Sequence, residues 1–253
     1  MSYSTERNTA MSARSIWLSL LALLIGGWAI WTLETARQGL TFTELTVGPT
    51  PVTRISDGSN GPPVVIAHGF AGSRQMMLSY ANALAQGGYT IYNFDFEGHG
   101  RHSVPMGGDV EAIEGTTRRL INQTLSVIDH AADLNDRPIA LLGHSMASDV
   151  LVRTAQEDPR TGPLVLVSAF SQAIGPETPD DMLLITGEWE PGLREAALRY
   201  VQMVDPAGAE GMAVTSGEVP RKAAVAPSVA PVGVPFGSTG LEAARAWPDR
   251  AYR

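Results

Sequence analysis

Apolar runs of strand length alternate with stretches of helical periodicity along most of this chain. Continuous apolar runs are typical of buried parallel strands, and they predict strands at 63–67, 89–94, 138–142, 163–168 and 182–186. The stretches between them predict helices at 73–86, 121–128, 147–155 and 193–203. Two earlier runs, 42–47 and 51–55, are interpreted as a hairpin. This alternation predicts an α/β fold with a doubly wound, mostly parallel sheet.

A separate apolar segment lies near the N-terminus. Residues 15–33 carry no charged side chain and have tryptophans near both ends. Because about 20 apolar residues cross a ~30 Å hydrocarbon core, this segment predicts one transmembrane helix. A cleaved signal peptide is the alternative, but its apolar region is normally about 7 to 15 residues and ends at an A-x-A-like site. Glu34 and Thr35 match such a site poorly. A buried core helix is disfavoured because the segment is apolar on all sides.

The charges that flank this segment predict its orientation. Arg7 and Arg14 precede it, whereas Glu34 and Arg37 follow it, a weak positive-inside bias that places the N-terminus in the cytoplasm. The predicted organisation is a cytoplasmic tail at 1–14, a membrane helix at 15–33, a tether at 34–41 and a folded domain at 42–253. The domain is then expected outside the cytoplasm.

The part of that domain after residue 205 has the weakest pattern. Five prolines between positions 206 and 235 interrupt a Gly-, Ala- and Val-rich stretch, so secondary structure is least defined over 206–253. Thr239 and Glu242 have the spacing of a capping box that opens a final helix. Pro248 is expected to end that helix after Trp247 and to leave it unstable.

Composition narrows the classes of function. A chain of 253 residues is long enough for one sizeable domain and a targeting segment. The net charge of −8, with scattered Lys and Arg, gives no basic patch for a polyphosphate, so no nucleic acid partner is expected. The chain has no cysteine, which excludes disulfides, thiolate metal sites and cysteine nucleophiles.

The strongest chemical signal lies between a predicted strand and a predicted helix. Gly143, His144, Ser145, Met146 and Ala147 are a near match to the nucleophile elbow G-x-S-x-G. Small residues are needed on both sides because the strained turn crowds its neighbours, and alanine in the last place is a mild departure. The helix start would aim the Met146 amide at an oxyanion beside Ser145. The ordinary alternative is that Ser145 only caps a helix.

A second motif follows the predicted strand 63–67. His68, Gly69 and Phe70 stand where an HG-type oxyanion loop belongs. A glycine at 69 allows a tight turn, after which the Phe70 amide can point at the same developing charge as the Met146 amide. The alternative is an ordinary glycine turn.

Together these motifs resemble the α/β-hydrolase superfamily, in particular its serine esterases and lipases. The resemblance rests on His68-Gly69-Phe70, on the segment from Asp95 to Gly100 and on the Ser145 elbow, and it covers about 42–203. It implies an α/β-hydrolase fold with helices on both faces of the sheet. Only residues 169–181 separate the last two predicted central strands, too few for a helical lid, so an open site without a lid domain is expected.

The resemblance also implies an acid after the strand 182–186. In that family an Asp or Glu lies three residues after the glycine that follows the strand, and Glu190 has this place after Gly187. Its implied role is to orient an imidazole. Glu188 is the competing carboxylate, and either one can be a solvated loop charge.

The family's histidine is missing. It should follow the acid in the chain, but all five histidines precede Ser145. His144, inside the elbow, is expected to point away from the serine hydroxyl. The tail after residue 224 resembles the family's last strand and histidine loop, with Pro231 in the place of the histidine.

Metal and cofactor sites are not implied. His99 and His102, with Asp95 and Glu97 nearby, can be imagined as metal ligands, but a strand-end turn is the more common meaning of such a loop. No G-x-G-x-x-G dinucleotide turn is present.

Three hypotheses follow. The first is a serine hydrolase of carboxylic esters or similar small acyl compounds, acting through an acyl-serine at Ser145. The second is a catalytically impaired member that binds an acyl-like ligand or a partner protein, because Ser145 lacks a base. The third is a sequence altered near its C-terminus.

Overall fold

The computed structural model describes residues 13–229 and 233–252. The chain divides into two compact units, with the boundary between Gln38 and Gly39. The first unit contains helix α1 (Ala13–Thr35), whose mean hydropathy of 1.9 makes it long and apolar enough to cross a membrane. None of its residues is buried. A signal sequence near an N-terminus meets the same criterion.

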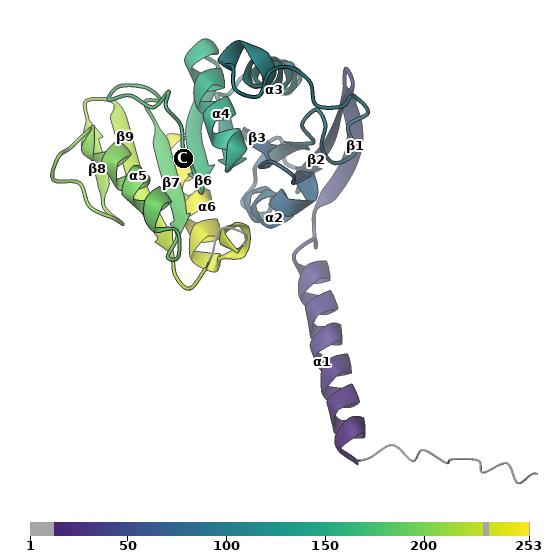
Figure 1. The fold of residues 1–253 in the computed structure, drawn as a ribbon. Helices are drawn as coiled ribbons and strands as arrows, with labels where there is room; N and C mark the ends of the chain where they lie inside the picture. The colour runs from purple at the N-terminus through teal and green to yellow at the C-terminus, as the bar shows by residue number, and fades with distance from the viewer. Residues whose placement is uncertain (1–12, 230–232, 253) are drawn as a thin grey trace, which may run out of the picture. The chain divides into compact units, whose positions relative to one another are not determined.

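The described part of the second unit is built on a nine-stranded sheet (Figure 1). The strands are β1 (Thr41–Val47), β2 (Thr50–Ser56), β3 (Pro63–Ala67), β4 (Thr90–Phe94), β5 (Ile139–His144), β6 (Thr161–Val167), β7 (Met182–Gly187), β8 (Ala213–Ser216) and β9 (Val219–Ala226). Their order is β1-β2-β4-β3-β5-β6-β7-β9-β8. The block from β4 to β9 is parallel, whereas β1, β2 and β8 join antiparallel at the two edges.

Helices cover both faces of this sheet. The α-helices are α2 (Leu78–Gln86), α3 (Arg118–Ala132), α4 (Met146–Glu157), α5 (Pro191–Gln202) and α6 (Ser238–Tyr252), and the short helical segments are η1 (Arg74–Met77), η2 (Ile113–Thr117) and η3 (Val234–Phe236). Helices α3, α4 and α5 pack in one core with the sheet, and α2 and α6 pack in the other.

Strand β7 shows why the central strands are apolar throughout. Met182 and Leu184 belong to the core under α3, α4 and α5, while Leu183 and Ile185 belong to the core under α2 and α6. Because successive side chains of a strand point to opposite faces, a strand covered on both faces needs apolar residues at every position. The predicted doubly wound α/β-hydrolase fold is confirmed.

The C-terminal helix corrects one prediction. Helix α6 does not end after Trp247 but continues through Pro248 to Tyr252. A proline inside a helix removes one hydrogen bond and costs ~3 kcal/mol. Tertiary contacts offset that cost: Trp247 is buried, the Tyr252 hydroxyl donates to the Pro138 carbonyl at 2.7 Å, and the Tyr89 hydroxyl donates to Asp249 at 2.5 Å.

The connection between β6 and β7 holds no helix in the described residues 169–181. The absence of a lid domain stays a prediction. The sequence pattern gave no structural role to the long connection between β4 and α3. In the structure, Met106, Val110 and Thr116 of this connection line a cavity.

Candidate active site

Ser145 lies on a sharp turn between β5 and α4. It is an exposed residue with φ 53° and ψ −117°, in the left-handed range that non-glycine residues rarely adopt. Its side chain makes no capping hydrogen bond to the helix. The alternative reading of Ser145 as an ordinary helix cap therefore does not describe this geometry.

Small residues on both sides of Ser145 let the strand and helix approach each other. A Cβ atom on Gly143 would come within 2.6 Å of the Leu151 side chain and 3.2 Å of the Ala147 Cβ. Ala147 is fully buried in that contact. A methyl group fits in the last place of the motif, which explains why alanine stands there instead of glycine.

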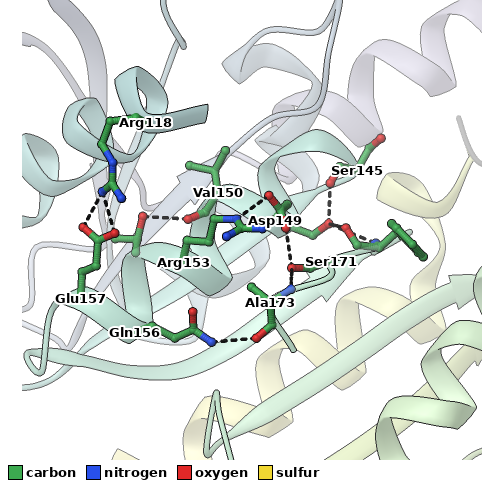
Figure 2. Close-up of polar contacts among 12 residues, drawn as sticks. Arg118, Ser145, Asp149, Val150, Arg153, Gln156, Glu157, Ser171 and Ala173 are labelled. Carbon is green, nitrogen blue, oxygen red and sulfur yellow. Dashed lines mark hydrogen bonds and ion pairs between the residues drawn. The ribbon is translucent and has the colours of Figure 1, made fainter. Parts of the chain in front are cut away.

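The strained turn is fixed by backbone hydrogen bonds. The Ser145 amide donates to the Val167 carbonyl on β6 at 2.9 Å. The Ser145 carbonyl accepts from the Ser148 amide at 2.8 Å and from the Ser148 hydroxyl at 2.5 Å (Figure 2). A left-handed non-glycine residue costs of the order of 1 kcal/mol or more, so such positions persist only where neighbours hold them.

The loop that holds Phe70 lies against this turn. A Cβ atom on Gly69 would stand 3.0 Å from the Ser145 Cβ and 2.9 Å from the His144 ring, so the approach requires glycine. Phe70 lines the same cavity as Ser145 and Met146. Met146 is the first residue of α4, and an amide at that position has no acceptor within its own helix.

Buried His68 shapes the Phe70 loop. Its Nδ1 lies 2.7 Å from the Gly69 carbonyl, and its Nε2 accepts a hydrogen bond from the Phe96 amide at 3.1 Å. Burial lowers the pKa of His68 to about 4. The ring is therefore neutral at pH 7, carries its proton on Nδ1 and has no nitrogen left to act as a base.

Asp95, His99 and His102 have hydrogen-bond partners in the surrounding backbone. The Asp95 carboxylate accepts from the Arg74 amide at 2.8 Å and from the Arg101 amide at 2.9 Å. The Nδ1 atoms of His99 and His102 contact carbonyls two residues away. Among the residues that the structure describes, no cluster of three or more His, Asp or Glu side chains is placed to hold a metal ion.

The two candidate acids differ sharply in environment. Glu190 is only 4% exposed, and its Oε2 accepts from the Gly187 amide at 2.6 Å and from the Ser168 hydroxyl at 3.0 Å. Its Oε1 is buried and has no hydrogen-bond partner among the described residues. Glu188 is exposed and accepts from the Ser228 amide at 2.7 Å. Only Glu190 is enclosed beside the sheet edge that carries Ser145.

Pro231, the position expected to hold the histidine, lies outside the described residues. Val229 and Val234, which flank this position, contact the loop that carries Glu190. The Trp189 amide donates to the Val229 carbonyl at 3.2 Å, and a Cβ atom on Gly187 would meet Val229 and Val234 within 3 Å.

Sequence reasoning missed Ser168. This residue follows β6 directly, has φ 50°, is 5% exposed and donates its hydroxyl to Glu190. It lines the cavity of Ser145. The available signal was a serine immediately after an apolar strand, at the carboxyl edge of a parallel sheet where ligands bind.

The cavity beside Ser145 has a volume of about 580 Å³, within the usual range for small-molecule sites. Its wall is formed by Phe70, Met106, Val110, Thr116, Thr117, Leu120, Ser145, Met146, Asp149, Val150, Ser168, Phe170 and Leu193. Histidine is absent from this wall within the described part of the chain. An apolar group of moderate size fits such a surface.

The one carboxylate in the cavity wall is paired. Asp149 accepts from the Ser171 hydroxyl at 2.6 Å and from the Arg153 guanidinium at 2.8 Å (Figure 2). Because Arg153 balances its charge, the wall carries no isolated negative charge at this point.

Comparisons with known proteins identify the family of this chain. Residues 60–214 match the family model described as "Serine aminopeptidase, S33". Two curated proteins from Escherichia coli, each described as an uncharacterized 31.7 kDa protein in the traX-finO intergenic region, are 27% and 26% identical over 164 residues. Each alignment covers 63% of this chain and 52% of the relative, so the chain spans about half the length of the curated relatives it matches.

Solved structures share the fold at low identity. A dienelactone hydrolase from Anabaena variabilis is 17% identical with a TM-score of 0.58, and covers 85% of this chain and 98% of its own. A predicted CIB-like hydrolase from Thermoplasma acidophilum is 16% identical with a TM-score of 0.59, covering 84% and 98%. At these identities the likeness extends to the fold alone.

Proposed function

This chain belongs to the serine aminopeptidase family of α/β-hydrolases, and from that premise we propose that it hydrolyses carboxylic esters or related acyl compounds through an acyl-serine on Ser145. The observation that carries the proposal is the exposed Ser145 on a strained strand-to-helix turn, facing an apolar cavity and closely approached by Gly69. Family membership supports hydrolase activity in general. The serine mechanism is the finer step proposed.

In the proposed reaction the Ser145 Oγ attacks the acyl carbon and the leaving group departs. Water then attacks the acyl-serine and releases the acid. The amides of Phe70 and Met146 are proposed to stabilise the oxyanion of each tetrahedral intermediate. A single such donor is worth about 3 kcal/mol. Glu190 is the proposed acid.

The proposed substrate is a small compound with an apolar acyl group. The cavity volume and its aromatic and aliphatic wall support this class. The family description names aminopeptidases, so an aminoacyl amide is the second substrate to assay. The net charge of −8 argues against a nucleic acid partner.

We also propose that α1 anchors the protein in a membrane as a single span. Its uncharged centre and its 23-residue length support this location. The proposed orientation has the N-terminus in the cytoplasm and the hydrolase domain outside it, on the balance of Arg7 and Arg14 against Glu34 and Arg37.

The test of the hydrolase proposal uses the full chain in detergent micelles. It is incubated with a fluorophosphonate probe, a nitrophenyl butyrate ester and an aminoacyl nitroanilide. The Ser145→Ala variant is expected to lose labelling and at least about 100-fold in turnover. The matched control Ser126→Ala, an exposed serine on α3, is expected to behave as the parent. Labelling that persists in Ser145→Ala would refute the assignment.

A second candidate function is binding without turnover. The observation that favours it is the lack of a histidine in the described cavity wall, together with proline at position 231. The Pro231→His variant separates the two candidates. Under the binding proposal the parent is inactive and Pro231→His gains ester hydrolysis. If Pro231→His gains none, position 231 is not the place of the family histidine.

A further inference from the structure

We propose that Ser168 relays the proton of Ser145 to Glu190. This inference rests on the proposed function and deepens it. It assigns a role to a buried serine that the motif pattern does not contain.

Strand register places the two serines side by side. His144 on β5 pairs with Val167 on β6, and Ser145 and Ser168 each follow directly. The Ser145 amide donates to the Val167 carbonyl at 2.9 Å, so the pairing continues into the turn. Adjacent strands lie about 4.8 Å apart, so the two serines are neighbours across the sheet. Both serines line the same cavity.

The next strand brings the acid to Ser168. The Ser168 amide donates to the Ile185 carbonyl of β7 at 2.7 Å, which ties the end of β6 to the strand before Glu190. The Ser168 hydroxyl donates to the Glu190 Oε2 at 3.0 Å. Glu190 is 4% exposed and is not among the residues that line the cavity. A proton from the cavity therefore needs an intermediate group to reach this carboxylate, and Ser168 contacts both places.

The strained backbone of Ser168 supports a functional role for its side chain. Its φ of 50° is in the left-handed range, which favours glycine, and yet the position holds a serine with its hydroxyl turned inward to the acid. Strained conformations of this kind collect at functional sites and persist where the surroundings fix them. A purely structural turn here would be satisfied better by glycine.

The proton balance of the relay is complete. As the Ser145 Oγ bonds to the acyl carbon, its proton passes to the Ser168 Oγ, while the proton of Ser168 passes to the Glu190 carboxylate. When the tetrahedral intermediate collapses, Glu190 returns one proton through Ser168 to the leaving oxygen or nitrogen. Deacylation repeats the route, with water as the donor and the Ser145 oxygen as the leaving group.

The test compares Ser168→Ala, Ser168→Gly and Glu190→Gln with the parent, as full chains in micelles. Ser168→Gly removes the hydroxyl and relieves the backbone strain, so it covers the case in which Ser168→Ala fails to fold. Each variant is expected to lose about 100-fold in kcat with KM little changed. The double variant Ser168→Gly with Glu190→Gln should lose no more than either single variant, because both act on one path.

The outcomes separate the relay from the proposed function. If the probe labels Ser145 in the parent and Ser168→Gly keeps the parental kcat, the relay is wrong and the serine hydrolase stands. Multiplying losses in the double variant would also overturn the relay. If the parent is neither labelled nor active, the relay falls together with the proposed function.

Discussion

Four non-glycine residues of the described chain adopt positive φ angles, namely Ala71, Ser145, Ser168 and Ser228. They follow β3, β5, β6 and β9, so all four lie beyond the carboxyl ends of parallel strands. Each such residue costs free energy that a loop elsewhere on the surface avoids. At the scale of single residues, strain therefore gathers at one edge of the sheet, the edge at which open α/β sheets bind their ligands.

His68 supports one of these strained loops, and its protonation state predicts a pH effect. Burial lowers its pKa to about 4, from about 6.5 in the unfolded chain. Between these values the unfolded state binds a proton that the folded state does not, so stability falls as the pH drops from 6.5 to 4. The loss from this residue is about 3 kcal/mol when complete.

Nuclear magnetic resonance of the ¹⁵N-histidine-labelled chain checks this effect at the residue itself. The His68 ring is expected to stay neutral, with the proton on Nδ1, down to about pH 5. His130 on α3 is the internal comparison because it lies away from the site. A His68 signal that titrates near pH 6.5 would contradict the prediction.

At the scale of elements, the central strands were predictable and the wall of the site was not. Strands 63–67 and 182–186 are covered on both faces, so their apolar runs coincide with β3 and β7. The register between β5 and β6 has no sequence signature, so the neighbour of Ser145 was missed. The β4–α3 connection lines the cavity through tertiary contacts, and such contacts leave no periodic pattern in the sequence.

The end of helix α6 was also not predictable from the local sequence. Local propensity predicts an end at Trp247, but the helix buries this tryptophan and makes two hydrogen bonds with Tyr89 and Pro138, which lie far away in the chain. The candidate acid, in contrast, could be chosen from local sequence spacing. Its distance from Gly187 is set within one loop, and the structure encloses Glu190 while leaving Glu188 in solvent.

Strand β9 carries an element-scale prediction at Arg221. This side chain is fully buried and donates to the carbonyls of Tyr200 at 2.9 Å and Pro179 at 3.1 Å, joining the end of α5 to the β6–β7 connection. Burial lowers its pKa to about 10, so it stays charged at pH 7. Arg221→Met leaves these carbonyls without a donor and should cost about 3 kcal/mol.

Denaturant unfolding of the full chain in micelles measures that cost. The matched control is Arg245→Met on α6, an exposed arginine for which a change within about 0.5 kcal/mol is expected. Equal stability of Arg221→Met and the parent would show that the buried guanidinium does not hold the two segments together.

At the scale of the whole molecule, both hydrophobic cores lie in the second unit, and α1 has no buried residue. Folding of the hydrolase domain therefore does not depend on burying α1 within it. Side chains such as Trp17 and Leu23 are more than 70% exposed, and burying that apolar surface in lipid is favourable. The full chain is expected to stay with the membrane fraction after an alkaline carbonate wash, and a chain that starts at Gly39 is expected to leave it.

The absence of cysteine makes the orientation directly measurable. Single cysteines are introduced as Ser4→Cys before α1 and as Ser126→Cys on the exposed side of α3, and intact cells are treated with a membrane-impermeant maleimide. Because the positive-inside bias places the N-terminus in the cytoplasm, Ser126→Cys should be labelled in intact cells and Ser4→Cys only after lysis. The reverse pattern would place the hydrolase domain in the cytoplasm. A mature chain that has lost residue 4 but keeps Ser126→Cys would identify α1 as a cleaved signal sequence instead of an anchor.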